Sequence, residues 1–232
     1  MTGPVQWRRD ASTSRLVRVL WALGVGTFFA VISIIVFWRL FDLTGEVGGQ
    51  VVIVGIGAAL VVTILLVALS RNTERHVARL ARSLSLEEPT DRGVGRAVDA
   101  ALGTIAMIGV IGGLMIVGRY VSQEGLLEVG AGPFTFLAAL SIPLALVALV
   151  LSSFLRSVGT IDAEEGALYL HDPDEHVALE HLEGVSVRQF GGTAVVTLEY
   201  ATPDGTYVPG PRRLVVPADV ARELEGLIDT TQ

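Results

Sequence analysis

The sequence predicts a membrane α-helical protein with four transmembrane helices, followed by a small C-terminal β domain. Hydrophobic residues make up 51% of the 232-residue chain, and they gather in four long blocks. From about residue 157 the hydrophobic period changes to two, the spacing of half-buried strands. Charge divides at the same point: residues 1–156 carry a net +3, whereas residues 157–232, with four Arg and 14 acids, carry −10.

The four apolar blocks match the length of a membrane span. A bilayer core about 30 Å thick takes roughly 20 helical residues, and the predicted spans are 19–38, 51–69, 100–117 and 134–155. They form a helical domain over 19–156, preceded by the segment 1–18. The first block follows several Arg, as a signal peptide would, but its apolar core is too long and no small-residue cleavage pattern follows. We expect it to be retained as an anchor.

The distribution of Arg predicts the orientation. Four Arg precede the first span and six lie between the second and third, while the other two connections hold only Arg39 and Arg119. Both termini are therefore expected on the cytoplasmic side of the cell membrane. Trp38, Phe41 and Tyr120 fall at the opposite ends of the spans, where amphipathic rings prefer the headgroup zone.

The connection 70–98 begins with an amphipathic pattern that is expected to extend the second helix or to lie in the interface, ending before Pro89. Its Arg-rich side supplies candidate contacts to lipid headgroups: Arg71, Arg75, Arg79 and Arg82. Equally, these Arg could serve only to set the topology. The patch is short and has no interleaved aromatic residues, so nucleic-acid binding is not expected.

Small residues recur every four positions within the spans, which lets helix backbones approach closely. The rows are Ala22, Gly26 and Ala30; Gly55 and Ala59; and Gly109 and Gly113. They indicate either a homo-oligomer seam or packing within one four-helix bundle, and we favour the bundle. Ionisable residues lie only at the edges of the spans, Asp99 among them, which argues against a coupled pump.

The C-terminal part, residues 157–232, predicts up to seven short strands and one terminal helix. Alternating stretches such as "GALYLH" and "TAVVTLEY" are separated by turn signals such as "DPDE" and "PDG". After Pro217, the stretch "ADVARELEGLI" places Val220, Leu224 and Ile228 on one helical face, with Asp219 favouring the helix start.

The order of these elements, the opening "EEGALYLHDPDEHVALEHLEGVSV" and the closing "PADVARELEGLI" resemble the pleckstrin-homology-like domains attached to prokaryotic membrane proteins. The resemblance covers about residues 157–229. It implies two packed antiparallel sheets closed by a helix, and a binding or scaffolding module without catalytic residues. Phosphoinositide binding is not implied, because the first hairpin is strongly acidic and would be repelled by an anionic membrane.

The acidic, Lys-free composition resembles that of haloarchaeal-type proteins, in which dense carboxylates keep the surface hydrated. A high-GC genome, which replaces Lys by Arg, is the alternative.

Three histidines in the opening hairpin, His171, His176 and His181, raise the question of a metal site. Around the "DPDE" turn, His171 and His176 are expected to face each other across two strands. His181 follows at an odd spacing, so it could join them only through a bulge or bend near 178–183. We favour a solvated hairpin and assign no metal. The chain has no Cys and no recognisable catalytic motif, so neither an enzyme nor a cofactor is expected.

Two functions follow from these observations. The first is a non-enzymatic membrane protein whose residues 157–232 bind a partner protein or act as a scaffold. The alternative is a small transport or channel subunit regulated by that domain. The absence of charges buried in the spans favours the first.

Overall fold

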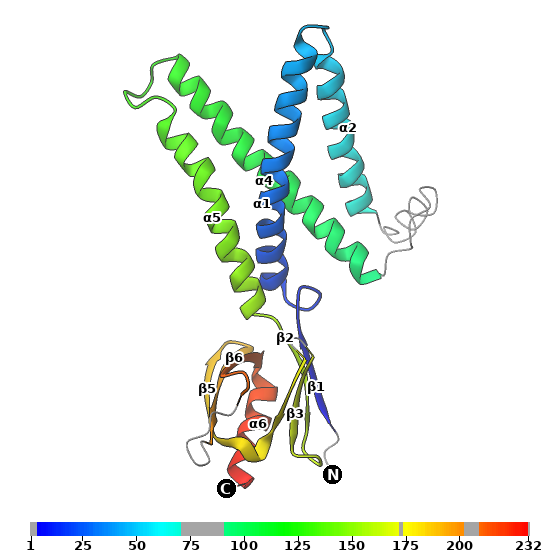
Figure 1. Ribbon diagram of the computed structural model, residues 1–232, viewed down its shortest axis with the longest axis vertical. Helices are drawn as coiled ribbons and strands as arrows, with labels where there is room; N and C mark the ends of the chain where they lie inside the picture. The colour runs from blue at the N-terminus through cyan, green and yellow to red at the C-terminus, as the bar shows by residue number, and fades with distance from the viewer. Residues whose placement is uncertain (1–3, 71–90, 172–173, 202–208, 232) are drawn as a thin grey trace. The chain divides into compact units, whose positions relative to one another are not determined.

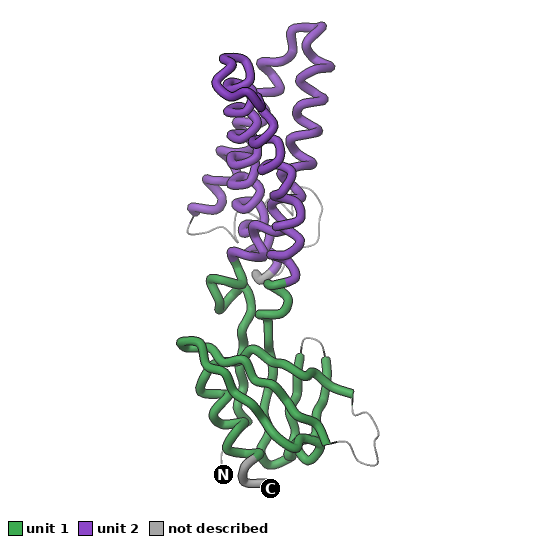
Figure 2. The backbone as a smooth tube through the Cα atoms, turned by 90° about the vertical axis from the view of Figure 1, so that its left-hand side faces the viewer, with its two compact units in different colours: residues 1–18, 151–232 green, residues 19–150 purple. Residues whose placement is uncertain are grey.

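The computed structural model describes residues 4–70, 91–171, 174–201 and 209–231. The chain forms two compact units, shown in Figure 2. One, the helical unit, comprises residues 19–150. The other, the β unit, combines residues 1–18 with residues 151–232, so both ends of the chain belong to the same unit.

The helical unit is built from four long apolar helices, as the sequence predicts (Figure 1). They are α1 (Arg15–Gly45), α2 (Gln50–Leu69), α4 (Asp91–Gln123) and α5 (Gly132–Phe154). All four are long and apolar enough to cross a membrane. All four begin before the predicted apolar spans, and α4 begins earliest, because the polar stretch before residue 100 is part of the helix.

Helices α1 and α4, which cross in Figure 1, approach closely at two glycines. A Cβ added at Gly26 would lie 2.3 Å from the backbone carbon of Gly103. One added at Gly103 would lie 2.0 Å from the carbonyl oxygen of Ala22. The row containing Ala22 and Gly26 therefore packs within the unit, as favoured from the sequence. Gly55, Gly109 and Gly113 instead face open space.

The β unit contains two antiparallel sheets. The first has the order β1-β2-β3-β4 and the second the order β5-β6-β7. The strands are β1 (Val5–Arg9), β2 (Ser157–Asp162), β3 (Ala167–His171), β4 (Asp174–Ala178), β5 (Leu182–Phe190), β6 (Thr193–Tyr200) and β7 (Arg213–Pro217). A short 3-10 helix, η1 (Leu179–His181), joins the sheets, and α6 (Ala218–Thr231) ends the chain.

Strand β1 was not predicted from the sequence. Residues 5–9 pair along their whole length with β2, in a register that places Trp7 opposite Gly159. The Trp7 indole is buried, donates a 2.8 Å hydrogen bond to the hydroxyl of Ser157, and packs where a side chain at Gly159 would stand. The sequence does contain the alternation typical of a strand, because Val5 and Trp7 alternate with polar residues.

One hydrophobic core joins the two sheets and α6. Ile161, Leu168, Val196, Val216 and Leu224 are its most deeply buried large residues. They come from β2, β3, β6, β7 and α6, so each layer contributes. On α6, the helical stripe predicted from the sequence is buried while the opposite face is exposed. The predicted domain of antiparallel strands and one helix is therefore present.

The turn between β1 and α1 is held by the carboxylate of Asp10, which is buried. Two nitrogens of Arg8 lie 2.7 Å from its Oδ2, while Ser12 donates its amide and its hydroxyl to Oδ1. Burial alone would raise the pKa of Asp10, but the hydrogen bonds from Ser12 and Arg8 outweigh it and lower the pKa to about 2.

The α1–α4 crossing predicts opposite effects for two glycines of the same helix. Gly103→Ala should destabilise the protein by about 1 to 3 kcal/mol, because the new methyl group meets the backbone of α1. Gly109→Ala, in open space, should be neutral or stabilising by up to about 1 kcal/mol. Thermal unfolding of the purified protein in detergent measures both. Equal effects would contradict the close crossing.

Asp10 predicts a pH-dependent contribution to stability. Because its folded pKa is lowered to about 2 from 3.8, its ionised form stabilises the fold above about pH 4, and this is lost as the pH falls towards 2. Asp10→Asn should cost on the order of 1 kcal/mol at neutral pH. The difference between the two proteins in thermal midpoint should shrink below pH 4. A difference independent of pH would contradict the assignment.

Candidate functional site

The outer face of the β5-β6-β7 sheet is the candidate site, because the inner face is used by the core. Along β6, Ala194, Val196 and Leu198 point into the core, so Thr193, Val195, Thr197 and Glu199 lie on the other face. In β5, a bulge between Leu182 and Gly184 shifts the register against β6 and so changes which residues face outwards.

This outer face is hollowed. The hollow has a volume of about 420 Å³ and is lined by Ser186, Arg188, Phe190, Val195, Thr197, Glu199 and Arg213. We call this set of residues the arginine face. The register aligns Ser186, Thr197 and Arg213 in one row across the three strands, and Arg188 lies in the next row, opposite Val195. Two guanidinium groups therefore stand on either side of β6.

The charge of the arginine face differs from that of its surroundings. Residues 157–232 contain four Arg against 14 acidic residues, and two of the four Arg are on this face. Within the described part of the chain, no ion pair or hydrogen bond engages the guanidinium of Arg188 or Arg213. Glu199 is the one carboxylate in the lining; it is opposite Gly184, in the row next to that of Ser186 and Thr197 and on the side away from Arg188.

Phe190 adds an apolar component to the same surface. It is 68% exposed, at the end of β5, and is the one exposed large hydrophobic residue in the described strands of the β unit. An exposed ring beside two cations is typical of a recognition surface, because aromatic and Arg side chains carry much of the energy in protein interfaces.

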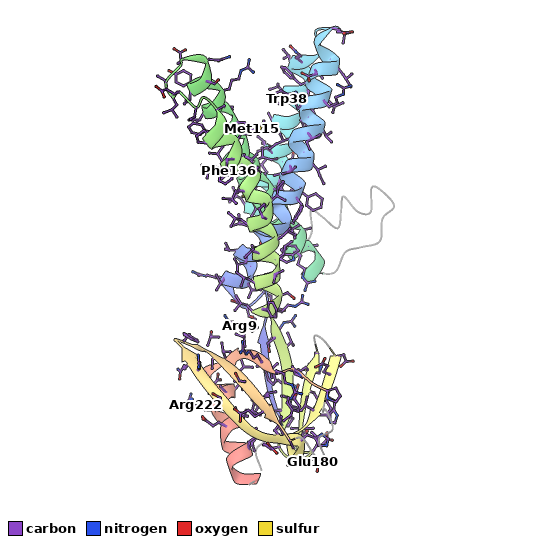
Figure 3. The ribbon with its side chains drawn as sticks, turned by 60° about the vertical axis from the view of Figure 1, so that its left-hand side comes forward. Arg9, Trp38, Met115, Phe136, Glu180 and Arg222 are labelled. Carbon is purple, nitrogen blue, oxygen red and sulfur yellow. The ribbon has the colours of Figure 1, made fainter. Side chains whose placement is uncertain are left out.

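Arg9 ties β1 to the second sheet near this face (labelled in Figure 3). Its Nε donates a 3.2 Å hydrogen bond to the carbonyl of Leu155, and its Nη1 donates to the hydroxyl of Thr193. Thr193 is opposite Phe190 at the β5–β6 hairpin. One side chain of the N-terminal segment thus fixes the start of β6, and with it one end of the arginine face.

The histidines considered from the sequence do not gather into a ligand set. His176 is opposite Tyr169, with ring centroids 5.0 Å apart, and His171 is opposite Asp174, so the two histidines are diagonal neighbours rather than direct partners. His181 is in η1, the bend that a three-histidine site would require, and its side chain is half exposed. Among the described residues, no group of three His, Asp or Glu could hold a metal ion.

The other sequence-derived candidates, Arg71, Arg75, Arg79 and Arg82, lie outside the described residues. The arginine face itself was missed by sequence reasoning. Arg188 and Arg213 are far apart in the chain, and only strand register brings them together. The sequence does contain one indication: both Arg residues occupy solvent-facing positions of strands in which apolar and polar residues alternate.

Comparison with known proteins gives no relative. No protein-family model matches the chain, and neither the curated proteins nor the solved structures contain a significant match.

The arrangement of the histidines predicts no response to zinc. Because His171 and His176 lack a third ligand among the described residues, zinc at micromolar concentration should leave the thermal midpoint of the purified protein unchanged. The same protein with a chelator is the control. A zinc-dependent rise that His176→Ala abolishes would contradict this.

Proposed function

We propose that the protein is a multi-pass membrane protein whose β unit is a non-enzymatic interaction module. In this proposal the arginine face binds an acidic segment of a partner protein on the cytoplasmic side of the cell membrane. The observation that carries the proposal is the pair of guanidinium groups that no described residue engages, beside an exposed Phe190, on the face of the second sheet that the core leaves open.

Insertion into a membrane is supported by the surface of the helical unit. No residue of α2 is buried, and apolar side chains such as Ile116 and Phe136 are more than 60% exposed (Phe136 is labelled in Figure 3). A water-soluble protein rarely exposes so much contiguous apolar surface, whereas hydrocarbon solvates it without cost.

Placement of both termini on one side is supported by the β1–β2 pairing. Residues 5–9 and 157–162 form one ladder, and four helices long enough to cross a membrane lie between them. Only an even number of crossings returns the chain to the side on which it began. The Arg residues that flank the helices then favour the cytoplasm as that side.

A pleckstrin-homology-like classification is supported by the element order. Four strands in one sheet, three in the other and a C-terminal helix agree with what the resemblance implies, provided that β1 is counted as the first strand. The domain would then include residues 4–9 in addition to residues 157–229. Such a domain binds through its surface, in agreement with the absence of a recognised catalytic motif.

The chemistry of the arginine face favours a segment that carries a carboxylate next to an apolar side chain. Strands β5 and β7 are separated by β6 and the two residues are offset by one row, so the backbones at Arg188 and Arg213 stand roughly 12 Å apart across the sheet. A carboxylate bound between them gains charge-assisted hydrogen bonds, and the hydroxyls of Ser186 and Thr197, in the row of Arg213, are further donors. The apolar side chain would pack on Phe190.

The transport alternative gains no support from the helical unit. A hollow between α1, α2 and α4 is lined by apolar residues and by two hydroxyl groups, without a charged side chain. Ion and substrate pathways usually need polar or charged groups along their length. Flux of common ions in reconstituted vesicles would restore this alternative.

Charge reversal on the arginine face tests the interaction proposal. Arg188→Glu and Arg213→Glu, each in the full-length protein, should reduce capture of the partner by roughly tenfold or more, because each removes a cation and adds a repelling charge. Affinity purification from the native membrane, with quantitative mass spectrometry, measures the captured partner.

Arg222→Glu is the matched control. Arg222 is exposed on α6 (Figure 3), and its Nε donates a hydrogen bond within that helix, so the same change in net charge occurs away from the arginine face. Its partners should be retained. Unchanged capture by both face variants, with folding verified by circular dichroism, would refute the proposed site.

A further inference from the structure

The helical unit contains a hollow that the interaction module does not use. It has a volume of about 900 Å³ and lies between α1, α2 and α4. Rings from α1, including Phe29, Phe37 and Phe41, form one wall, Gly57 of α2 lies against Phe37, and Ala100 and Ala101 of α4 line another side. Trp38 also lines it (labelled in Figure 3). The volume is in the range of a site for a small molecule or a single hydrocarbon chain.

The lining selects a hydrocarbon occupant. Its polar side chains are Ser33 and Thr104, and the Thr104 hydroxyl already donates a 2.8 Å hydrogen bond to the carbonyl of Ala100. A bound water needs two to four polar partners, so water would not fill this space. If the hollow were empty, the side chains that line it would lose dispersion contacts. A flexible apolar chain satisfies both constraints.

A cation lies in line with one side of the hollow. Arg96 is four and eight residues before Ala100 and Thr104, so the three residues share one face of α4. Its side chain is exposed, and no ion pair joins it to Asp99 or to another acid in the part of the chain that the structure describes. The lining of the hollow has no charged residue, and among the described side chains Arg96 is on the α4 face that could meet the polar end of a bound chain.

We infer that this hollow, called the groove below, holds an acyl chain of an anionic membrane lipid whose phosphate is bound by Arg96. The inference rests on the proposed membrane insertion, since the ligand comes from the bilayer. Charge complementarity selects the lipid: a second copy of the chain would bring an apolar helix into the groove and leave Arg96 without an anion. The phosphate gains a charge-assisted hydrogen bond, and the chain gains contact with the aromatic wall.

The test uses the full-length protein, purified in mild detergent and mixed with dioleoyl phosphatidylglycerol or with dioleoyl phosphatidylcholine. Native mass spectrometry counts the lipids retained per chain. The wild-type protein should retain one phosphatidylglycerol in preference to phosphatidylcholine. Arg96→Gln should reduce retention of the anionic lipid by about tenfold and affect the zwitterionic lipid much less, because the choline cation already offsets the attraction between its phosphate and Arg96.

A second variant tests the chain rather than the headgroup. Ala100→Leu places a larger side chain in the groove and should reduce retention of both lipids. Ala106→Leu is the matched control, because it makes the same change at an exposed position of α4 that does not line the groove. Arg119→Gln, towards the other end of α4, is the corresponding control for charge. Both controls should retain lipid as the wild type does.

Several outcomes would overturn the inference. Equal retention by Ala100→Leu and Ala106→Leu would show that the chain does not enter the groove. Loss of a dimer peak in Ala100→Leu, without loss of lipid, would assign the groove to a second copy. Should Ala100→Leu fail to fold, Ala101→Leu gives the same test from the neighbouring position. Membrane insertion is checked separately by carbonate extraction, so a failed lipid site is distinguishable from a failed membrane assignment.

Discussion

The pairing of β1 with β2 is the constraint on which the β unit depends. It joins two segments separated by all four long helices, and the indole of Trp7 donates a hydrogen bond to Ser157, 150 positions away. The ladder between the first and second strands can form only after every helix has been made. During synthesis the N-terminal segment must therefore wait, unpaired, until residues 157–162 emerge. The cost of closing such a long loop grows only slowly with its length, and the buried indole offsets part of it.

The same pairing changes how the β unit should be delimited. A fragment that begins at residue 157 lacks an edge strand, the Trp7 side chain and the Arg9 bonds to Leu155 and Thr193. Its first sheet would end in the unpaired edge of β2. Studies of the module in isolation thus require the N-terminal segment as well, supplied by fusion or in trans.

Much of the fold could be predicted from the sequence, because its signals are periodic and local. Long apolar runs identify the four helices, and alternation identifies strands such as β3 and β6. The helical stripe ending at Ile228 identifies α6. Residues 5–9 were missed because their pattern is short and their Arg8 and Arg9 also fit the expected flank of a transmembrane helix. The arginine face was missed because it depends on register between strands, which local patterns do not contain. The loop Arg residues remain a prediction.

The position of β1 also has a genetic consequence. A message translated from a start codon placed after codon 9 would still encode all four apolar helices and the six strands that follow α5. The product would have the same hydropathy profile, but β2 would carry a free edge, which invites pairing with other chains. Whether β2 is paired on both sides would therefore depend on codons that precede the first helix.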